Sequence, residues 1–243
     1  MNDWTTSHAR VLAQRHAEGW MFLIEAARDL RTTGAVAPSG RPLARALTEP
    51  VRVQAPGPLA VLEAGAGTGA VTRTLIPHLP RGSRLDIVEA NRRFATRLRG
   101  LVAGHPNLAG RHAQVNVHQT YVEDLDTDQR YDVIVSGLPL TNFTPAQVER
   151  VMARYLELLH PGGTLTYFAY LGTRRARRLT ASRAEALRHA AVDEVMADYQ
   201  RRYAVGRWTV WANLPPAHVW HLRRPRPPAA PHSPQQAADG TRR

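Results

Sequence analysis

A glycine-rich run and two acidic residues are the part of this sequence best suited to bind a small molecule. The run Glu63-Ala64-Gly65-Ala66-Gly67-Thr68-Gly69 follows a short apolar segment, and Glu89 ends the next apolar segment about twenty residues further on. Glycines let a backbone approach a ligand closely, and a carboxylate accepts hydrogen bonds from the hydroxyls of a ribose. A tight turn that needs glycine for its conformation alone is the alternative. The presence of both acids favours a site for a nucleoside-type cofactor.

The order of the acid and the glycines indicates which cofactor to expect. A dinucleotide-binding turn has the pattern G-x-G-x-x-G, whereas this run has E-x-G-x-G-x-G with the acid first. This pattern resembles the first motif of the class I S-adenosylmethionine (SAM) methyltransferases. The resemblance implies that SAM is the cofactor, that the backbone of residues 65–69 approaches its methionyl end, and that Glu63 orients the turn or meets the ammonium group through water. It also implies that Glu89 binds the ribose.

The segments after the third and fourth predicted strands supply the remaining candidate residues of the site. By the same resemblance, adenine binds at the end of the third strand, where Val122 and Glu123 are candidates, although Glu123 in a solvated turn is equally compatible with the sequence. After the fourth strand, the carbonyls of Ser136 and Leu138 and the amide of Asn142 are expected to hold a methyl-accepting amine. Methyl transfer depends mainly on positioning. An alternative role for Asn142 is purely structural, since asparagine is common in turns.

Alternating apolar segments and amphipathic segments predict the elements that position these residues. This βαβ alternation is typical of a mostly parallel α/β sheet with helices on both faces, here with seven strands, as in a Rossmann-like methyltransferase. The predicted strands are Leu59–Leu62, Leu85–Val88, Val115–Gln119, Tyr131–Ser136, Thr164–Tyr170, Val205–Leu214 and Val219–Arg223. The predicted helices that follow the glycine-rich run are Val71–Leu79, Arg92–Ala103, Pro145–Leu159 and one that ends near Tyr203.

The ends of the chain differ from this alternating region. The spacing of apolar residues over residues 7–30 predicts an amphipathic helix with a cluster of large apolar side chains around Trp20. We therefore expect an N-terminal helical cap or membrane-docking region over residues 1–50 and a methyltransferase domain over residues 51–223. Residues 224–243, rich in Pro, Ala, Gln and Arg, predict a disordered basic tail.

Composition and charge restrict the classes of function. The chain of 243 residues has no cysteine, so disulfides, a thiolate nucleophile and a cysteine-based zinc site are excluded. Its eleven histidines lack ligand spacing, and we expect no metal. The net charge of +12, supplied by arginine without any lysine, predicts attraction to nucleic acid or to an anionic membrane surface. Six of the arginines lie in residues 174–188 and are expected to help dock the protein on such a surface. A merely soluble basic surface is the alternative. The absence of a long apolar run or a signal sequence predicts a cytoplasmic protein.

Three segments carry a closer resemblance to a known family: residues 33–39, residues 135–143 and residues 211–220. Together they are similar to the soluble bacterial phospholipid N-methyltransferases, which convert phosphatidylethanolamine to phosphatidylcholine. The resemblance implies a lipid-amine substrate and peripheral binding to the inner face of the cell membrane through the N-terminal helix. The sequence is also similar to the ribosomal RNA adenine dimethyltransferases, whose loop before the first motif closes over SAM, so Ser39 is a further candidate cofactor-binding residue.

Several alternatives to the lipid-amine reading stay open at this point. An RNA adenine substrate is less favoured, because no Tyr or Phe follows Pro139 to stack on a flipped base. An amphiphilic or natural-product amine is a third acceptor class. A protein that binds anionic lipid or nucleic acid without catalysis is the alternative from a different class of function. The number of methyl groups transferred and the oligomeric state do not follow from the sequence.

Overall fold

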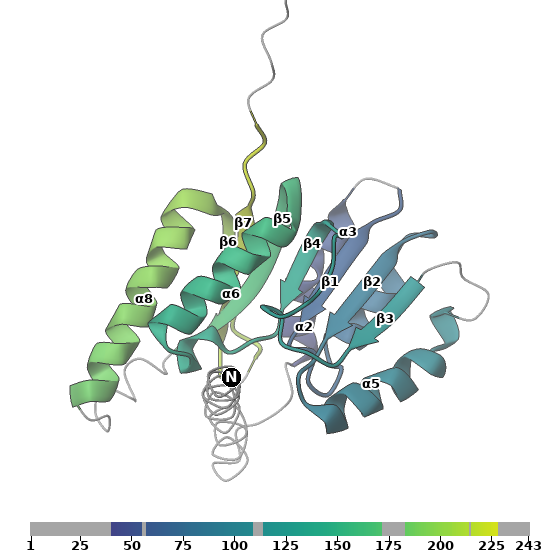
Figure 1. The fold of residues 1–243 in the computed structure, drawn as a ribbon, viewed down its shortest axis with the longest axis horizontal. Coiled ribbons are helices and arrows are strands. Elements are labelled where there is room, and N and C mark those ends of the chain that lie inside the picture. The colour runs from purple at the N-terminus through teal and green to yellow at the C-terminus, as the bar shows by residue number, and fades with distance from the viewer. Residues whose placement is uncertain (1–39, 55–56, 109–113, 172–182, 214, 228–243) are drawn as a thin grey trace, which may run out of the picture.

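A seven-stranded sheet forms the centre of the molecule (Figure 1). The computed structural model describes residues 40–54, 57–108, 114–171, 183–213 and 215–227. The strands are β1 (Ala60–Ala64), β2 (Arg84–Val88), β3 (Gln114–His118), β4 (Tyr131–Ser136), β5 (Leu159–Tyr170), β6 (Ala204–Val210) and β7 (Ala217–Arg223). The helices are α2 (Arg41–Leu47), α3 (Glu49–Val53), α4 (Thr72–Leu75), α5 (Arg92–Ala103), α6 (Pro145–Leu158) and α8 (Arg183–Tyr203), with 3-10 turns η1 (Ile76–His78), η2 (Pro106–Leu108) and η3 (Leu140–Asn142).

The strand order predicts a crevice at the carboxyl ends of β1 and β4. The order is β3-β2-β1-β4-β5-β7-β6, in which β1 to β5 are parallel while β7 is antiparallel to both β5 and β6. Because β1 lies between β2 and β4, the connections from β1 and from β4 leave the sheet in opposite directions. Ligands of open α/β sheets bind at such a switch point, outside the carboxyl ends of the strands. The glycine-rich run follows β1 at this point.

Two hydrophobic cores lie on the two faces of the sheet, because successive side chains of a strand point to opposite faces. Leu62 of β1 packs on the face covered by α6 and α8, whereas Val61 packs on the face covered by α2, α4 and α5. Figure 1 shows α6 and α8 together in front of the sheet. The predicted α/β fold, with a mostly parallel seven-stranded sheet and helices on both faces, is confirmed.

Several predicted boundaries are wrong. Strand β5 begins at Leu159, five residues before the predicted start at Thr164. Its first residues belong to the sheet because the backbone of Gly162 and Gly163 pairs with Arg224, in hydrogen bonds of 2.8 and 3.0 Å. Arg224 was predicted to begin the disordered tail, but this pairing and its guanidinium bonds to the Glu157 and Leu159 carbonyls fix it in place.

Two helices also differ from the expectation. The helix predicted over residues 71–79 is split into α4 and η1, because Pro77 has no N–H to continue the helical hydrogen bonds. Helix α3 forms over Glu49–Val53, outside the predicted helices. It therefore runs across the predicted domain boundary at residue 50, and both α2 and α3 pack on the core of the sheet. The three-part domain division stays a prediction.

Three predictions fall outside the described residues: the helix over residues 7–30, Ser39, and the arginines of residues 174–178. The same holds for residues 228–243 of the tail. Within the described part of the chain, no helix is long and apolar enough to cross a membrane.

Candidate active site

The glycine turn after β1 has a backbone conformation that only glycine adopts easily. Gly65 and Gly67 have φ angles of 71° and 55°, in the left-handed region. A Cβ on Gly65 would lie 2.3 Å from the Cδ2 atom of Leu138, so the absence of a side chain lets the turn approach the segment after β4. A Cβ on Gly67 would meet no atom within 4 Å, which leaves open space at the crevice. Gly69, also a predicted cofactor residue, packs against Leu101 of α5.

Glu89 ties this turn to the end of β2. Its Oε2 atom accepts a hydrogen bond from the Gly67 amide at 2.7 Å, and its Oε1 atom accepts one from the Asn91 amide at 2.8 Å. The side chain is almost fully buried, and burial raises the pKa of this carboxyl even though both hydrogen bonds lower it. The structure therefore places Glu89 directly beside the glycine turn, where its remaining lone pairs are available to ribose hydroxyls. That second role stays a prediction.

Glu63 lies inside the sheet, beneath the turn. Its Oε2 atom accepts a hydrogen bond from the Thr72 hydroxyl at 2.7 Å, whereas its buried Oε1 atom has no partner among the described residues. Burial raises the pKa of the Glu63 carboxyl from 4.5 to about 7, and the nearby charge of Glu89 contributes to this increase. A buried acceptor without a partner costs free energy. A cationic or N–H donor that reaches Oε1 would remove this cost.

The segment after β4 lies against the glycine turn. The Gly137 amide donates to the Ala64 carbonyl at 2.8 Å, and a Cβ on Gly137 would lie 2.6 Å from the Gly65 carbonyl oxygen. The side chain of Ser136 is fully buried, where its hydroxyl accepts hydrogen bonds from the Tyr155 hydroxyl at 2.9 Å and from the Leu138 amide at 3.4 Å. The Ser136 side chain therefore shapes this segment from below and does not face the crevice.

The backbone carbonyls of two predicted acceptor-binding residues, Leu138 and Asn142, already have protein partners. The Leu138 carbonyl accepts a hydrogen bond from the Leu140 amide at 2.9 Å, which leaves one lone pair for a substrate. Asn142 belongs to η3, and its carbonyl accepts a hydrogen bond from the Nη1 atom of Arg188 at 3.2 Å. The same Arg188 atom donates to the Phe143 carbonyl at 3.2 Å. Helix α8 therefore fixes the end of this segment.

The segment after β3 contributes an acidic group near the crevice. Val122 is buried and its side chain packs in the hydrophobic core; its contact with the cofactor stays a prediction. Burial raises the pKa of the half-buried Tyr121 hydroxyl, and neighbouring negative charges raise it further. These charges belong to Glu123, Asp124 and Glu89. Tyr121 and these carboxylates therefore lie close together at the carboxyl edge of the sheet.

Four residues of this site were not among the predicted ones: Thr72, Tyr121, Tyr155 and Arg188. Thr72, Tyr155 and Arg188 each contact a predicted residue that belongs to a different element. Their spacing in the sequence therefore does not indicate that they belong to the site. Tyr121 has a signal, because it stands at the end of the third predicted strand, where class I methyltransferases commonly carry an acid. Its position indicated a cofactor contact as strongly as that of Glu123.

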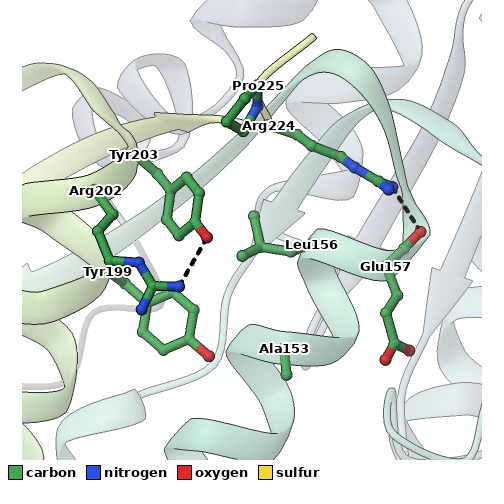
Figure 2. A pocket seen from close by; sticks show the side chains of 8 residues that line it. All are labelled: Ala153, Leu156, Glu157, Tyr199, Arg202, Tyr203, Arg224 and Pro225. Carbon is green, nitrogen blue, oxygen red and sulfur yellow. Dashed lines mark hydrogen bonds between the residues drawn. The ribbon is translucent and has the colours of Figure 1, made fainter. Parts of the chain in front are cut away.

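A pocket of about 400 Å³ between α6, α8 and the end of β7 lies away from this site (Figure 2). It lies at the opposite edge of the sheet, because Arg223 at the end of β7 pairs with Thr164 of β5, far from the carboxyl end of β5. Its two arginines have partners: Arg202 donates to the Tyr203 hydroxyl at 2.9 Å, and Arg224 donates to the Glu157 carbonyl at 3.1 Å. The first of these contacts lies within α8, and the second joins α6 to the segment that follows β7.

Comparisons with known proteins agree with this geometry. Residues 61–163 match the family model of a methyltransferase domain. The chain is 28% identical over 167 residues to an ornithine lipid N-methyltransferase of Singulisphaera acidiphila, which covers 67% of this chain and 74% of that protein. Among solved structures, the N-methyltransferase NodS of Bradyrhizobium japonicum WM9 has a TM-score of 0.58 at 18% identity, covering 78% of this chain and 98% of that chain.

A second solved structure matches a larger part of the chain. The 1,6-didemethyltoxoflavin-N1-methyltransferase of Burkholderia thailandensis has a TM-score of 0.56 at 18% identity, over 90% of both chains. Its structure contains S-adenosylhomocysteine, as does one structure of NodS. At such low identities these likenesses show the fold, whereas the family model shows the methyltransferase domain.

S-adenosyl-L-methionine is the cofactor of this domain, as predicted. The residues present fit it: Gly67 leaves open space beside the turn, and the unpartnered Oε1 atom of Glu63 is a buried acceptor that a cationic ligand could satisfy. Glu63, Glu89 and the backbone of residues 65–67 would hold the cofactor. Among the described residues, no group of three or more His, Cys, Asp and Glu side chains could hold a metal ion.

Proposed function

We propose that this S-adenosyl-L-methionine-dependent methyltransferase transfers its methyl group to the nitrogen of a lipid amine, with phosphatidylethanolamine as the substrate and phosphatidylcholine as the final product. The predicted alternative of a binding protein without catalysis is set aside, because the chain has the methyltransferase domain. The similarity to an ornithine lipid N-methyltransferase supports a lipid amine as the acceptor class.

The observation that carries this proposal is the contact between the glycine turn and the segment after β4. Gly137 lies against the Gly65 carbonyl, so an acceptor bound by this segment is adjacent to the cofactor site. The cofactor supplies a methyl group on a sulfonium centre. The segment supplies backbone carbonyls and the Asn142 amide, which can orient an amine by accepting its N–H bonds. An amine with a free lone pair needs orientation more than acid–base catalysis.

The acidic residues at the edge of the crevice also favour an amine. Glu89, Glu123 and Asp124 lie around Tyr121, in a chain whose net charge is +12. This local negative charge attracts an ammonium headgroup from solution or from a bilayer. A carboxylate near the bound ammonium is also a group to which its proton can pass before the nitrogen attacks the methyl carbon. The bases of RNA carry no ammonium group for these carboxylates to bind.

The location of the enzyme is part of the proposal. A lipid amine stays in the bilayer while it reacts, so the enzyme has to dock on the surface of the membrane. We propose peripheral association with an anionic surface on the cytoplasmic face, through residues 7–30 and the arginines of residues 174–183, since Arg188 already binds the carbonyls of η3. The excess of arginine supports this arrangement, because cationic side chains bind anionic headgroups.

Methyl transfer from labelled S-adenosyl-L-methionine tests the substrate. The protein is incubated with vesicles of phosphatidylethanolamine, with vesicles of an ornithine lipid, with total RNA and with free ethanolamine, and each fraction is extracted and counted. We expect label in phosphatidylethanolamine and its mono- and dimethylated products. Label in ornithine lipid alone would mean that the substrate is a different lipid, while the acceptor class would still be a lipid amine. Label in RNA or in free ethanolamine, with none in lipid, would overturn the proposal.

A single substitution then tests the acceptor site. Asn142→Ala should lower the turnover of the lipid substrate while leaving the affinity for the cofactor nearly unchanged. Calorimetry measures the affinity and the labelled assay measures turnover. Equal losses in both would mean that Asn142 only maintains the turn after β4.

A further inference from the structure

A second pocket lies beside the glycine turn, between α2 and the α4–η1 segment. Its volume is about 550 Å³. Three arginines and a histidine line it, and no carboxylate does; the lining residues are Gly40, Arg41, Ala44, Arg45, Ala70, Arg73, Thr74, Pro77 and His78. None of the functions assigned above uses this pocket.

The arginines of this pocket have no carboxylate partner among the described residues. By contrast, several arginines elsewhere pair with carboxylates: Arg84 with Asp86, Arg154 with Glu157, and Arg202 with Asp198. Within the described ranges, no hydrogen bond or ion pair reaches the guanidinium groups of Arg41 and Arg45, which belong to exposed residues on successive turns of α2. Two cationic side chains thus border the same hollow without a counter-charge.

The other cationic groups of the pocket add to the positive field. Arg73 donates to the carbonyls of Thr68 and Gly69, both at 3.1 Å, which neutralises none of its charge. Burial lowers the pKa of the His78 imidazole, and the charges of Arg52 and Arg45 lower it further. The charge of Arg45 therefore acts across the pocket. The Gly40 amide is not a free donor, because it donates to the side chain of Asn213 at 2.9 Å.

We propose that this pocket binds a phosphate group, held by the guanidinium groups of Arg41 and Arg45, with Arg73 and His78 on the opposite wall. Guanidinium groups bind phosphate oxygens in pairs of parallel hydrogen bonds, and an anion at this place removes the repulsion between the cationic side chains. The ligand is a phosphate ester, which either a lipid headgroup or a soluble phosphate can supply. Only the lipid source rests on the proposed function.

If the phosphate belongs to a lipid headgroup, the position of the pocket would let it orient the enzyme on the bilayer. Ala70, which lines the pocket, lies between the glycine turn and α4, so a headgroup phosphate held here would place the enzyme on the bilayer with its crevice close to the surface. This phosphate would belong to an anionic lipid next to the substrate molecule. The same interaction would then add to the attraction of the whole chain for an anionic surface.

The double variant Arg41→Gln/Arg45→Gln tests the pocket, with Arg93→Gln/Arg97→Gln as the control. The control removes the same charge from exposed residues of α5, on a helix that does not line the pocket. Calorimetric titration at low salt with inorganic phosphate and with glycerol 3-phosphate measures binding. We expect the pocket variant to lose about tenfold or more in affinity. The control should stay within about twofold, as expected for screened long-range charge.

Two arms of the experiment separate the sources of phosphate. Both variants and the wild type are sedimented with phosphatidylcholine vesicles with and without phosphatidylglycerol. If only the pocket variant loses binding to the anionic vesicles, and glycerol 3-phosphate competes with the vesicles, the ligand is a lipid headgroup. Unchanged vesicle binding alongside lost phosphate binding supports the pocket and assigns a soluble ligand.

Other results would overturn the proposal. Equal loss of phosphate affinity in the control would mean that net charge alone binds the anion, and unchanged affinity in the pocket variant would mean that phosphate binds elsewhere. In wild-type protein, saturating phosphate should also raise the pKa of His78, followed by NMR, and an unchanged His78 titration would contradict its place in the pocket. These titrations contain no methyl acceptor, so a failure of the lipid-amine proposal leaves their interpretation intact.

Discussion

Replacing Glu63 by glutamine should change how the stability of the protein depends on pH. The carboxyl of Glu63 is buried, and one of its oxygens has no partner in the described part of the structure, so its charged form is disfavoured in the folded state. The pKa rises from 4.5 to about 7. At about 1.4 kcal/mol for each tenfold change in the ionisation equilibrium, the charged form costs about 3 kcal/mol of stability.

The sign of the effect follows from proton binding. Between pH 4.5 and about 7, the folded state holds a proton on Glu63 that the unfolded state has lost, so raising the pH destabilises the folded state. Below pH 4.5 both states are protonated, and above about 7 both are ionised, so the contribution is constant outside this window. The glutamine side chain is never charged and lacks this contribution.

Urea unfolding of wild type and Glu63→Gln at a series of pH values measures the difference. Relative to the variant, the wild type should lose about 3 kcal/mol between pH 4.5 and 7.5. Glu157, whose side chain is 64% exposed, gives the control, and Glu157→Gln should run parallel to the wild type. If the difference between wild type and Glu63→Gln does not change with pH, the reasoning about this buried carboxyl is wrong.

Three further predictions concern the geometry of the crevice. Glu89→Ala removes a charged hydrogen-bond acceptor and should weaken cofactor binding by about 1.5–3 kcal/mol; unchanged affinity in calorimetry would refute the assignment. Tyr155→Phe removes the donor to the Ser136 hydroxyl, and turnover should fall more than cofactor affinity, as steady-state kinetics would show. Gly65→Ala should destabilise the fold by about 1 kcal/mol or more from the positive φ angle alone, besides its collision with Leu138, and thermal unfolding measures this loss.

The fold was predictable because its signals are local. Strand β4 begins and ends where the sequence predicted, at Tyr131 and Ser136, since an apolar segment of this length between polar turns fits a buried strand. The start of β5 was not predictable, because Pro161 and two glycines are typical of a turn. The pairing of Leu159 with Tyr131 of β4, and of the two glycines with the backbone of Arg224 far away in the sequence, brings this segment into the sheet.

The residues of the site likewise divide into those that local sequence spacing predicts and those that it does not. The glycine turn and Glu89 were predictable from spacing, and the structure brings them within hydrogen-bonding distance. The contact of Ser136 with Tyr155 depends on how α6 packs against β4, and the contact of Arg188 with η3 spans 46 residues. Such contacts are set by tertiary packing, which a single sequence does not reveal.

The carboxylate of Glu89 also affects which adenosine-containing molecules are excluded from the crevice. Many adenine nucleosides in a cell carry phosphate on the ribose or at its 5′ position, and they share the adenosine moiety of the true cofactor. A carboxylate bonded to the turn repels a phosphate carried on the ribose hydroxyl that it would bind, whereas it accepts hydrogen bonds from the free hydroxyls. Discrimination among metabolites that share the same base and sugar can therefore rest on the charge at the ribose, without any contact to the adenine.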